Sequence, residues 1–151
     1  MPGRTKARAA IVCSEFNEEI TSRMFSRATE RCRENGMAVT ATCIVPGAFD
    51  IPLFLDLLLS RRDVDCAITL GAIVKGDTDH DSVIAREVAS SVVGLSLKHG
   101  KPVALGISGP GMTWEQASDR AEEYAVRAAD AAMKMTLTLR KMRRARRRNA
   151  E

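Results

Sequence analysis

Apolar residues gather in four short runs along the chain, and segments of helical periodicity lie between these runs. Three runs are continuously apolar, as strands buried on both faces are, and one alternates in the manner of a half-buried strand. They occupy residues 9–13, 39–45, 67–74 and 103–107. The pattern therefore predicts four strands.

The intervening segments repeat their apolar residues every three or four positions, which is typical of one face of a helix. The first segment has four such residues, Ile20, Met24, Ala28 and Cys32, and Gly36 is well placed to end the helix. We predict further helices at residues 49–60, at about 78–99, and in a last helical region that Thr113 caps.

Strands that alternate with helices of this length are joined by crossovers, so the sheet is parallel and helices cover both of its faces. A chain of 151 residues has room for one such domain. The predicted fold is a single-domain α/β protein, a three-layer α/β/α sandwich around a parallel four-stranded sheet. The tripeptide Gly109-Pro110-Gly111 predicts a rigid loop after the fourth strand.

Ligands of parallel sheets bind beyond the carboxyl ends of the strands, and the unusual residues of this chain follow those ends. The third strand leads into a turn that opens a helix and contains Asp77, Thr78 and His80. Helix N-termini attract anions, so this turn can hold a phosphate beside an imidazole. Equally, Asp77 or Thr78 can be a simple N-cap and His80 a solvated residue, and spacing alone does not decide.

Motifs for common cofactors are missing. The chain contains no GxGxxG, GxxxxGK[ST] or GxSxG signature, and its four cysteines form no CxxC pair and are accompanied by only two histidines. We expect no cofactor and no metal. No run is apolar enough to span a membrane, and the N-terminus lacks an apolar signal core, so we expect a cytoplasmic protein.

The net charge of +4 comes from the C-terminus. Residues 140–151 hold seven of the 23 basic residues and one of the 19 acidic residues, which leaves the rest of the chain at −2. We expect a domain over residues 1–142 and a basic, solvent-exposed tail over 143–151. Such a run can bind nucleic acid, but a solvated helix end is its commoner use, so we do not expect nucleic acid as a partner.

Four blocks of the sequence occur in an informative order and spacing. They are SEFNEEIT at 14–21, VPGAFDIPL at 45–53, LGAIVKGDTDHD at 70–81 and GKPVALGISGPGMTWEQASDRA at 100–121. With these four blocks in register, the sequence resembles the lumazine synthase family, and the ISGPGMT segment is most similar to its archaeal branch.

The resemblance implies a flavodoxin-like sheet and a cofactor-free condensation in riboflavin biosynthesis. The two substrates would be 5-amino-6-ribitylaminouracil and 3,4-dihydroxy-2-butanone 4-phosphate. It also implies self-association as pentamers or multiples of them, with active sites between neighbouring subunits. Two alternatives stay open: an archaeal-type riboflavin synthase, and a lumazine- or flavin-binding shell protein without catalysis.

The resemblance assigns a proton-transfer role to His80, since an imidazole can both accept and donate a proton near neutral pH. Asp77 and Thr78 match the residues that contact the phosphate of the ketone substrate, and Arg120 matches a phosphate-binding arginine. From its own surroundings in the sequence, Arg120 reads as an ordinary surface residue of a helix.

The remaining assignments concern the pyrimidine and its ribityl chain. Phe16 matches an aromatic that stacks on the ring, although a core Phe is the simpler interpretation. The backbone of Ala72, Ile73 and Val74 matches a strand end beside the ring, and Ala48, Phe49 and Asp50 match the ribityl-binding segment. Leu105 and Asp81 stand where many members have aromatics, and we expect these departures to weaken binding of the ring.

Overall fold

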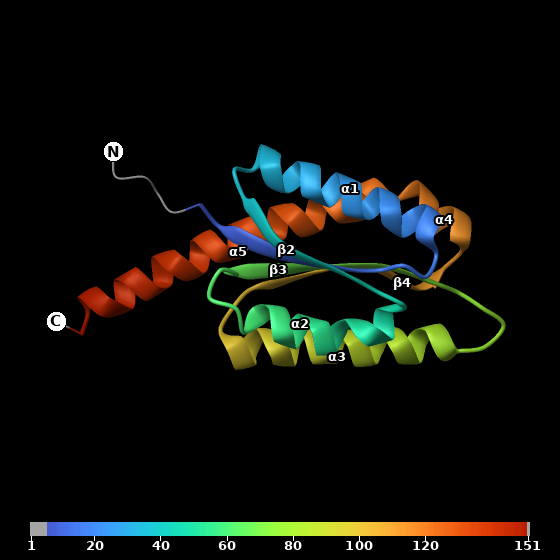
Figure 1. The fold of residues 1–151 in the computed structure, drawn as a ribbon. Helices are drawn as coiled ribbons and strands as arrows, with labels where there is room; N and C mark the ends of the chain where they lie inside the picture. The colour runs from blue at the N-terminus through green and yellow to red at the C-terminus, as the bar shows by residue number, and fades with distance from the viewer. Residues whose placement is uncertain (1–5, 151) are drawn as a thin grey trace.

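The computed structural model describes residues 6–150, which form one parallel four-stranded sheet with the strand order β2-β1-β3-β4 (Figure 1). The strands are β1 (Arg8–Ser14), β2 (Ala38–Val45), β3 (Cys66–Val74) and β4 (Val103–Met112). The central strands β1 and β3 are almost completely buried, as strands covered on both faces must be.

Helices cover both faces of the sheet, as predicted. On one face lie α1 (Glu18–Glu34), α4 (Trp114–Asp119) and α5 (Ala121–Arg148), and on the other lie α2 (Ile51–Leu59) and α3 (His80–His99), with the short 3₁₀ helix η1 (Ala48–Asp50) leading into α2 (Figure 1). The α/β/α sandwich and its parallel sheet are confirmed. No helix within residues 6–150 is long and apolar enough to cross a membrane.

The two faces have different cores. Between the sheet and α2 and α3, the core is built from branched aliphatic side chains such as Ile51, Leu55 and Val88. Between the sheet and α5, small residues dominate, and five buried alanines come from α5 itself: Ala121, Ala125, Ala128, Ala129 and Ala132. These short side chains let α5 lie close to the strands.

Helix α5 lies close to β4 at Gly106. A Cβ added at this glycine would lie 2.6 Å from the Thr69 carbonyl oxygen and 2.9 Å from the Ala128 Cβ, both closer than atoms can pack. Gly106 is therefore a packing requirement of the fold.

The fourth strand is longer than predicted. It continues through Gly109, Pro110 and Gly111 to Met112 instead of ending at residue 107, and the predicted rigid loop is wrong. The reason is tertiary: Val74 pairs with Met112 after a register shift, and the Lys75 N–H donates to the Met112 carbonyl over 2.7 Å.

The last helical region is two helices. Helix α4 begins with a capping box in which Thr113 and Gln116 bond each other's backbone N–H groups, and α5 starts after a break at Arg120. Thr113 is thus confirmed as a cap. The break leaves Arg120 exposed at the junction, near the carboxyl end of the sheet.

Helix α5 remains helical through the basic segment and extends past the amino-terminal edge of the sheet (Figure 1). Arg140 lies 3.3 Å from the Asp65 carboxylate, which Arg8 also binds, and Arg143 donates to the Gly100 carbonyl over 2.6 Å. Burial opposes ionisation of Asp65, but the bonds from Arg8 outweigh it and lower the pKa of this carboxyl. The helix therefore contacts the domain as far as Arg143.

Replacing Gly106 by Ala tests the close packing of α5. We expect the variant to lose about 1–3 kcal/mol of unfolding free energy, because the new methyl group must displace Ala128 or the strand. Chemical denaturation measures this change. Gly94→Ala is the matched control: this exposed glycine of α3 has nothing within 4 Å of the new Cβ, so the substitution should stabilise the helix by up to about 1 kcal/mol. Equal stability of both variants would contradict the packing account.

Candidate active site

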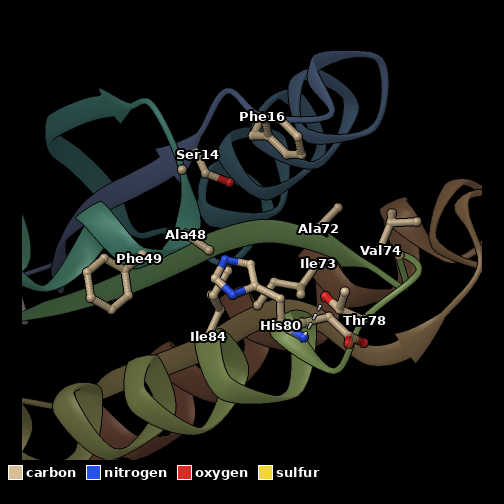
Figure 2. Close-up of a pocket in the computed structure, with 13 residues that line it drawn as sticks. Ser14, Phe16, Ala48, Phe49, Ala72, Ile73, Val74, Thr78, His80 and Ile84 are labelled. Carbon is tan, nitrogen blue, oxygen red and sulfur yellow. Dashed lines mark hydrogen bonds between the residues drawn. The ribbon is translucent and has the colours of Figure 1, made fainter.

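A cavity of about 400 Å³ opens at the carboxyl edge of the sheet, where β1, β2 and β3 end (Figure 2). Its walls come from three separate stretches of the chain, which fall within residues 14–16, 47–49 and 72–84. The lining residues are Ser14, Phe16, Gly47, Ala48, Phe49, Ala72, Ile73, Val74, Gly76, Thr78, His80, Asp81 and Ile84. The lining is mostly apolar, with a few polar groups at the start of α3, as in small-molecule sites.

Two aromatic side chains that line the cavity are exposed to solvent. Phe16 is 71% exposed and Phe49 is 63% exposed, so neither belongs to the core of the chain. The interpretation of Phe16 as a core residue is thereby wrong. Exposed aromatics beside a cavity provide flat apolar surface on which a planar ring can stack.

The position of Phe16 is fixed by the next residue. Asn17 adopts a left-handed backbone conformation with φ of 62°, and its side-chain amide donates to the Ala72 carbonyl over 2.9 Å. This bond ties the turn after β1 to the end of β3. The two cavity walls that carry Phe16 and Ala72 are therefore linked directly.

His80 is the first residue of α3, and its imidazole points towards the side of the cavity where Ala48 and Phe49 lie (Figure 2). The His80 backbone N–H donates to the Thr78 hydroxyl over 3.3 Å. The N-cap is Asp79, whose side chain makes no capping bond, so the interpretation of Asp77 or Thr78 as the N-cap is wrong. The turn residues 75–80 are all exposed, and the positive end of the α3 dipole faces them.

Four of the residues singled out in the sequence do not line this cavity. Asp50 is exposed in η1, and its carboxylate accepts the Gly47 N–H over 2.9 Å at the cavity rim. Asp77 is exposed in the turn. Leu105 and Arg120 lie elsewhere: Leu105, 51% exposed, lines a separate groove between β4 and α3, and Arg120 is exposed between α4 and α5.

Five lining residues are not among the twelve site residues expected from the sequence: Ser14, Gly47, Gly76, Asp81 and Ile84. Ser14 could have been included, because it is the polar residue that ends a buried strand at the carboxyl edge. The sequence marks Asp81 only as a departure from the family's aromatic, and neither its burial nor the 3.0 Å bond that its carboxylate accepts from the N–H of Gly111, 30 positions away, could be predicted. No local pattern indicates such a partner.

The described part of the chain offers no obvious metal centre, since no three His, Cys, Asp or Glu side chains within residues 6–150 gather as ligands would. Cys13 lies next to Ser14, and burial raises the pKa of its thiol to about 12. It is therefore a neutral thiol at physiological pH and a poor nucleophile.

Comparison with known proteins identifies the family of the chain. The profile of the 6,7-dimethyl-8-ribityllumazine synthase family matches residues 6–140. The chain belongs to this family.

Individual lumazine synthases are similar in sequence to this protein over nearly its whole length. The protein of Metallosphaera sedula is 50% identical over 135 residues, which cover 89% of each chain. That of Methanopyrus kandleri is 46% identical over 138 residues, 91% of this chain and 97% of its own, and that of Sulfolobus acidocaldarius is 43% identical over 143 residues, 95% of this chain and 90% of its own. All three carry the name 6,7-dimethyl-8-ribityllumazine synthase.

The cavity brings together most of the site residues that the sequence predicts for a member of this family. Eight of the twelve site residues expected from the sequence line it: Phe16, Ala48, Phe49, Ala72, Ile73, Val74, Thr78 and His80. The family match and the names of these relatives favour lumazine synthase over a riboflavin synthase.

Proposed function

We propose that this protein condenses 5-amino-6-ribitylaminouracil with 3,4-dihydroxy-2-butanone 4-phosphate to 6,7-dimethyl-8-ribityllumazine, releasing phosphate and water. The observation that carries the proposal is the cavity of a lumazine synthase family member in which exposed aromatics lie opposite a histidine at a helix N-terminus. No cofactor enters the proposal, because the amine of the pyrimidine supplies the nucleophile.

The aromatic side of the cavity suits the pyrimidine. Phe16 can stack on the ring, and the backbone at the end of β3, from Ala72 to Val74, can bond its polar edge. Asn17 already occupies the Ala72 carbonyl with one hydrogen bond, which leaves a second lone pair on this oxygen. The ribityl hydroxyls are then directed towards Ala48, Phe49 and the Asp50 carboxylate at the rim.

The α3 side of the cavity suits the phosphorylated ketone. Backbone N–H groups at the start of a helix bind phosphate, and the exposed turn at Asp77 and Thr78 leaves room for it. Elimination of phosphate needs a proton removed from a carbon beside the carbonyl. His80, the imidazole nearest this helix start, is the group that we assign to this proton transfer.

The site is completed by a neighbouring subunit in our proposal. Arg120 and Leu105 lie outside the cavity of their own chain, while Phe16, Phe49 and the α2 residues Leu53 and Leu57 are more than half exposed. Apolar surface of this kind is typical of a protein interface. An oligomer of at least five subunits would bury these side chains and bring Arg120 to the phosphate of the next subunit.

The purified protein should form lumazine from the two substrates without added metal or nucleotide. The increase in lumazine fluorescence measures the reaction. Retained substrate binding with no turnover would instead indicate a binding protein, and conversion of lumazine to riboflavin would indicate a riboflavin synthase. Activity that is lost in EDTA and restored by a metal ion would contradict the cofactor-free proposal.

His80→Ala should lower kcat by about 10²-fold or less, because general acid–base catalysis contributes about 10²–10⁴ and water can replace the imidazole in part. The KM values should change little, since the backbone of the turn is retained. Lys75→Ala is a matched control, because this exposed residue precedes the same turn and lines no part of the cavity. A His80→Ala enzyme with wild-type rates at every pH would remove the proton-transfer role.

Arg120→Ala should raise the KM for the butanone phosphate far more than that for the pyrimidine, since it removes a charge-assisted contact of about 1.5–3 kcal/mol. Co-expression with His80→Ala subunits tests where Arg120 acts. If it serves the neighbouring site, random mixing should restore about a quarter of the sites to wild-type composition. Mixed assemblies as poor as the two parents would place Arg120 outside the neighbour's site.

The basic tail should be dispensable for catalysis and for assembly. Because Arg143 contacts the Gly100 carbonyl, two truncations are informative: removal of residues 144–151, and removal of residues 143–151. Both should stay active oligomers, and only the longer deletion should lose a little stability. Light scattering measures the mass, with activity measured in parallel. A fully active monomer would contradict the oligomer, and an inactive but intact oligomer would contradict the dispensable tail.

A further inference from the structure

The turn that carries Asp77, Thr78 and His80 begins and ends at the same point of β4. At its start, the Lys75 N–H donates to the Met112 carbonyl over 2.7 Å. At its end, the Asp81 carboxylate accepts the Gly111 N–H over 3.0 Å. Residues 76–80 lie between these two bonds, and all of them are exposed.

Asp81 differs from the other acidic residues of this turn. It is only 8% exposed, whereas Asp77 and Asp79 are exposed. A buried carboxylate is costly unless it is hydrogen-bonded, and a position in the first turn of a helix also favours its negative charge. Asp81 meets both conditions through the Gly111 N–H and the start of α3.

The donor on β4 is itself held firmly. Gly109 and Gly111 have φ values of 97° and 75°, a conformation that favours glycine. A Cβ at Gly109 would collide with the backbone carbonyl of Ile73, a cavity residue, so β4 packs directly against the cavity wall here. With Val74 paired to Met112, the Gly111 N–H is a fixed point for the turn.

We propose that Asp81 is a positioning residue, which holds the phosphate-binding turn and His80 in register through its hydrogen bond to Gly111. Only the kinetic consequences of this inference rest on the proposed function. Asp81 acts through its neighbour in the chain, His80, and through the end of the turn. Its role depends on an oxygen acceptor at this position, and an amide oxygen can replace the carboxylate.

Two variants separate the effect of this hydrogen bond from the effect of the negative charge: Asp81→Ala removes both, and Asp81→Asn removes only the charge. Loss of a bond to a charged acceptor should lower kcat/KM for the butanone phosphate about tenfold or more in Asp81→Ala, through a lower kcat and a higher KM. The KM for the pyrimidine should change by less than about twofold, since Phe16 and β3 do not depend on this bond. Asp81→Asn should stay within about threefold of wild type, because its amide oxygen accepts the same N–H.

Asp79→Ala is the matched control, because this exposed carboxylate of the same turn makes no capping bond. It should leave the kinetic constants within about twofold of wild type. An Asp81→Asn variant as poor as Asp81→Ala would overturn the proposal in favour of the charge. Wild-type kinetics in Asp81→Ala, or equal increases of KM for both substrates, would also overturn it.

Hydrogen exchange tests the role of Asp81 independently of the proposed function. In mass-spectrometric measurements, peptides covering residues 75–81 and 108–112 should exchange faster in Asp81→Ala and at the wild-type rate in Asp81→Asn. This result is expected even from a protein that forms no lumazine, in which case only the proposed function fails. Unchanged exchange in Asp81→Ala would show that Asp81 does not hold the turn.

Discussion

Parallel pairing of β1 and β3 at the centre of the sheet is the constraint on which the rest of the molecule depends. Because all strands run the same way, each crossover leaves the sheet at the same edge. Phe16, Phe49 and His80 belong to three different crossovers and meet only for this reason. The strands β1 and β3 between them are almost completely buried, and such core strands are among the most stable parts of a domain.

The same architecture leaves the cavity half open. A four-stranded sheet with two helices on one face cannot cover the aromatic residues that follow its strands, and these side chains remain in solvent in the single chain. Exposing large apolar groups costs free energy that a neighbouring subunit can recover. In our proposal, Arg120 lies away from the cavity of its own chain because it serves the cavity of the neighbouring subunit. The chemistry and the assembly would then share one surface.

The end of β4 connects several parts of the site. It pairs with Val74 of the cavity wall, bonds both ends of the turn between residues 75 and 81, and leads through the α4 cap towards Arg120. Asp81, which the family resemblance places where many members have an aromatic, accepts the Gly111 N–H of that strand. In our proposal, this residue therefore has a positioning role of its own.

Much of the fold followed from the sequence, because hydrophobic periodicity is a local property that survives into the folded state. The strand positions of β1, β2 and β3, the C-terminal glycine of α1 and the Thr113 cap were all predicted within a few residues. The carboxyl-edge rule and the four family blocks also located Thr78, His80 and the exposed aromatics Phe16 and Phe49 at one cavity.

Long-range contacts decided the rest. The Gly109-Pro110-Gly111 segment is a turn by composition, and only its pairing with β3 makes it a strand. Asp81 looks like a surface residue of a helix, and only the position of Gly111 makes it a buried acceptor. Periodicity describes which face of an element is apolar, but it carries no information about which distant backbone group will lie opposite. The sequence by itself determined the layers and the edge where chemistry can occur, and the tertiary structure decided which bonds hold that edge in place.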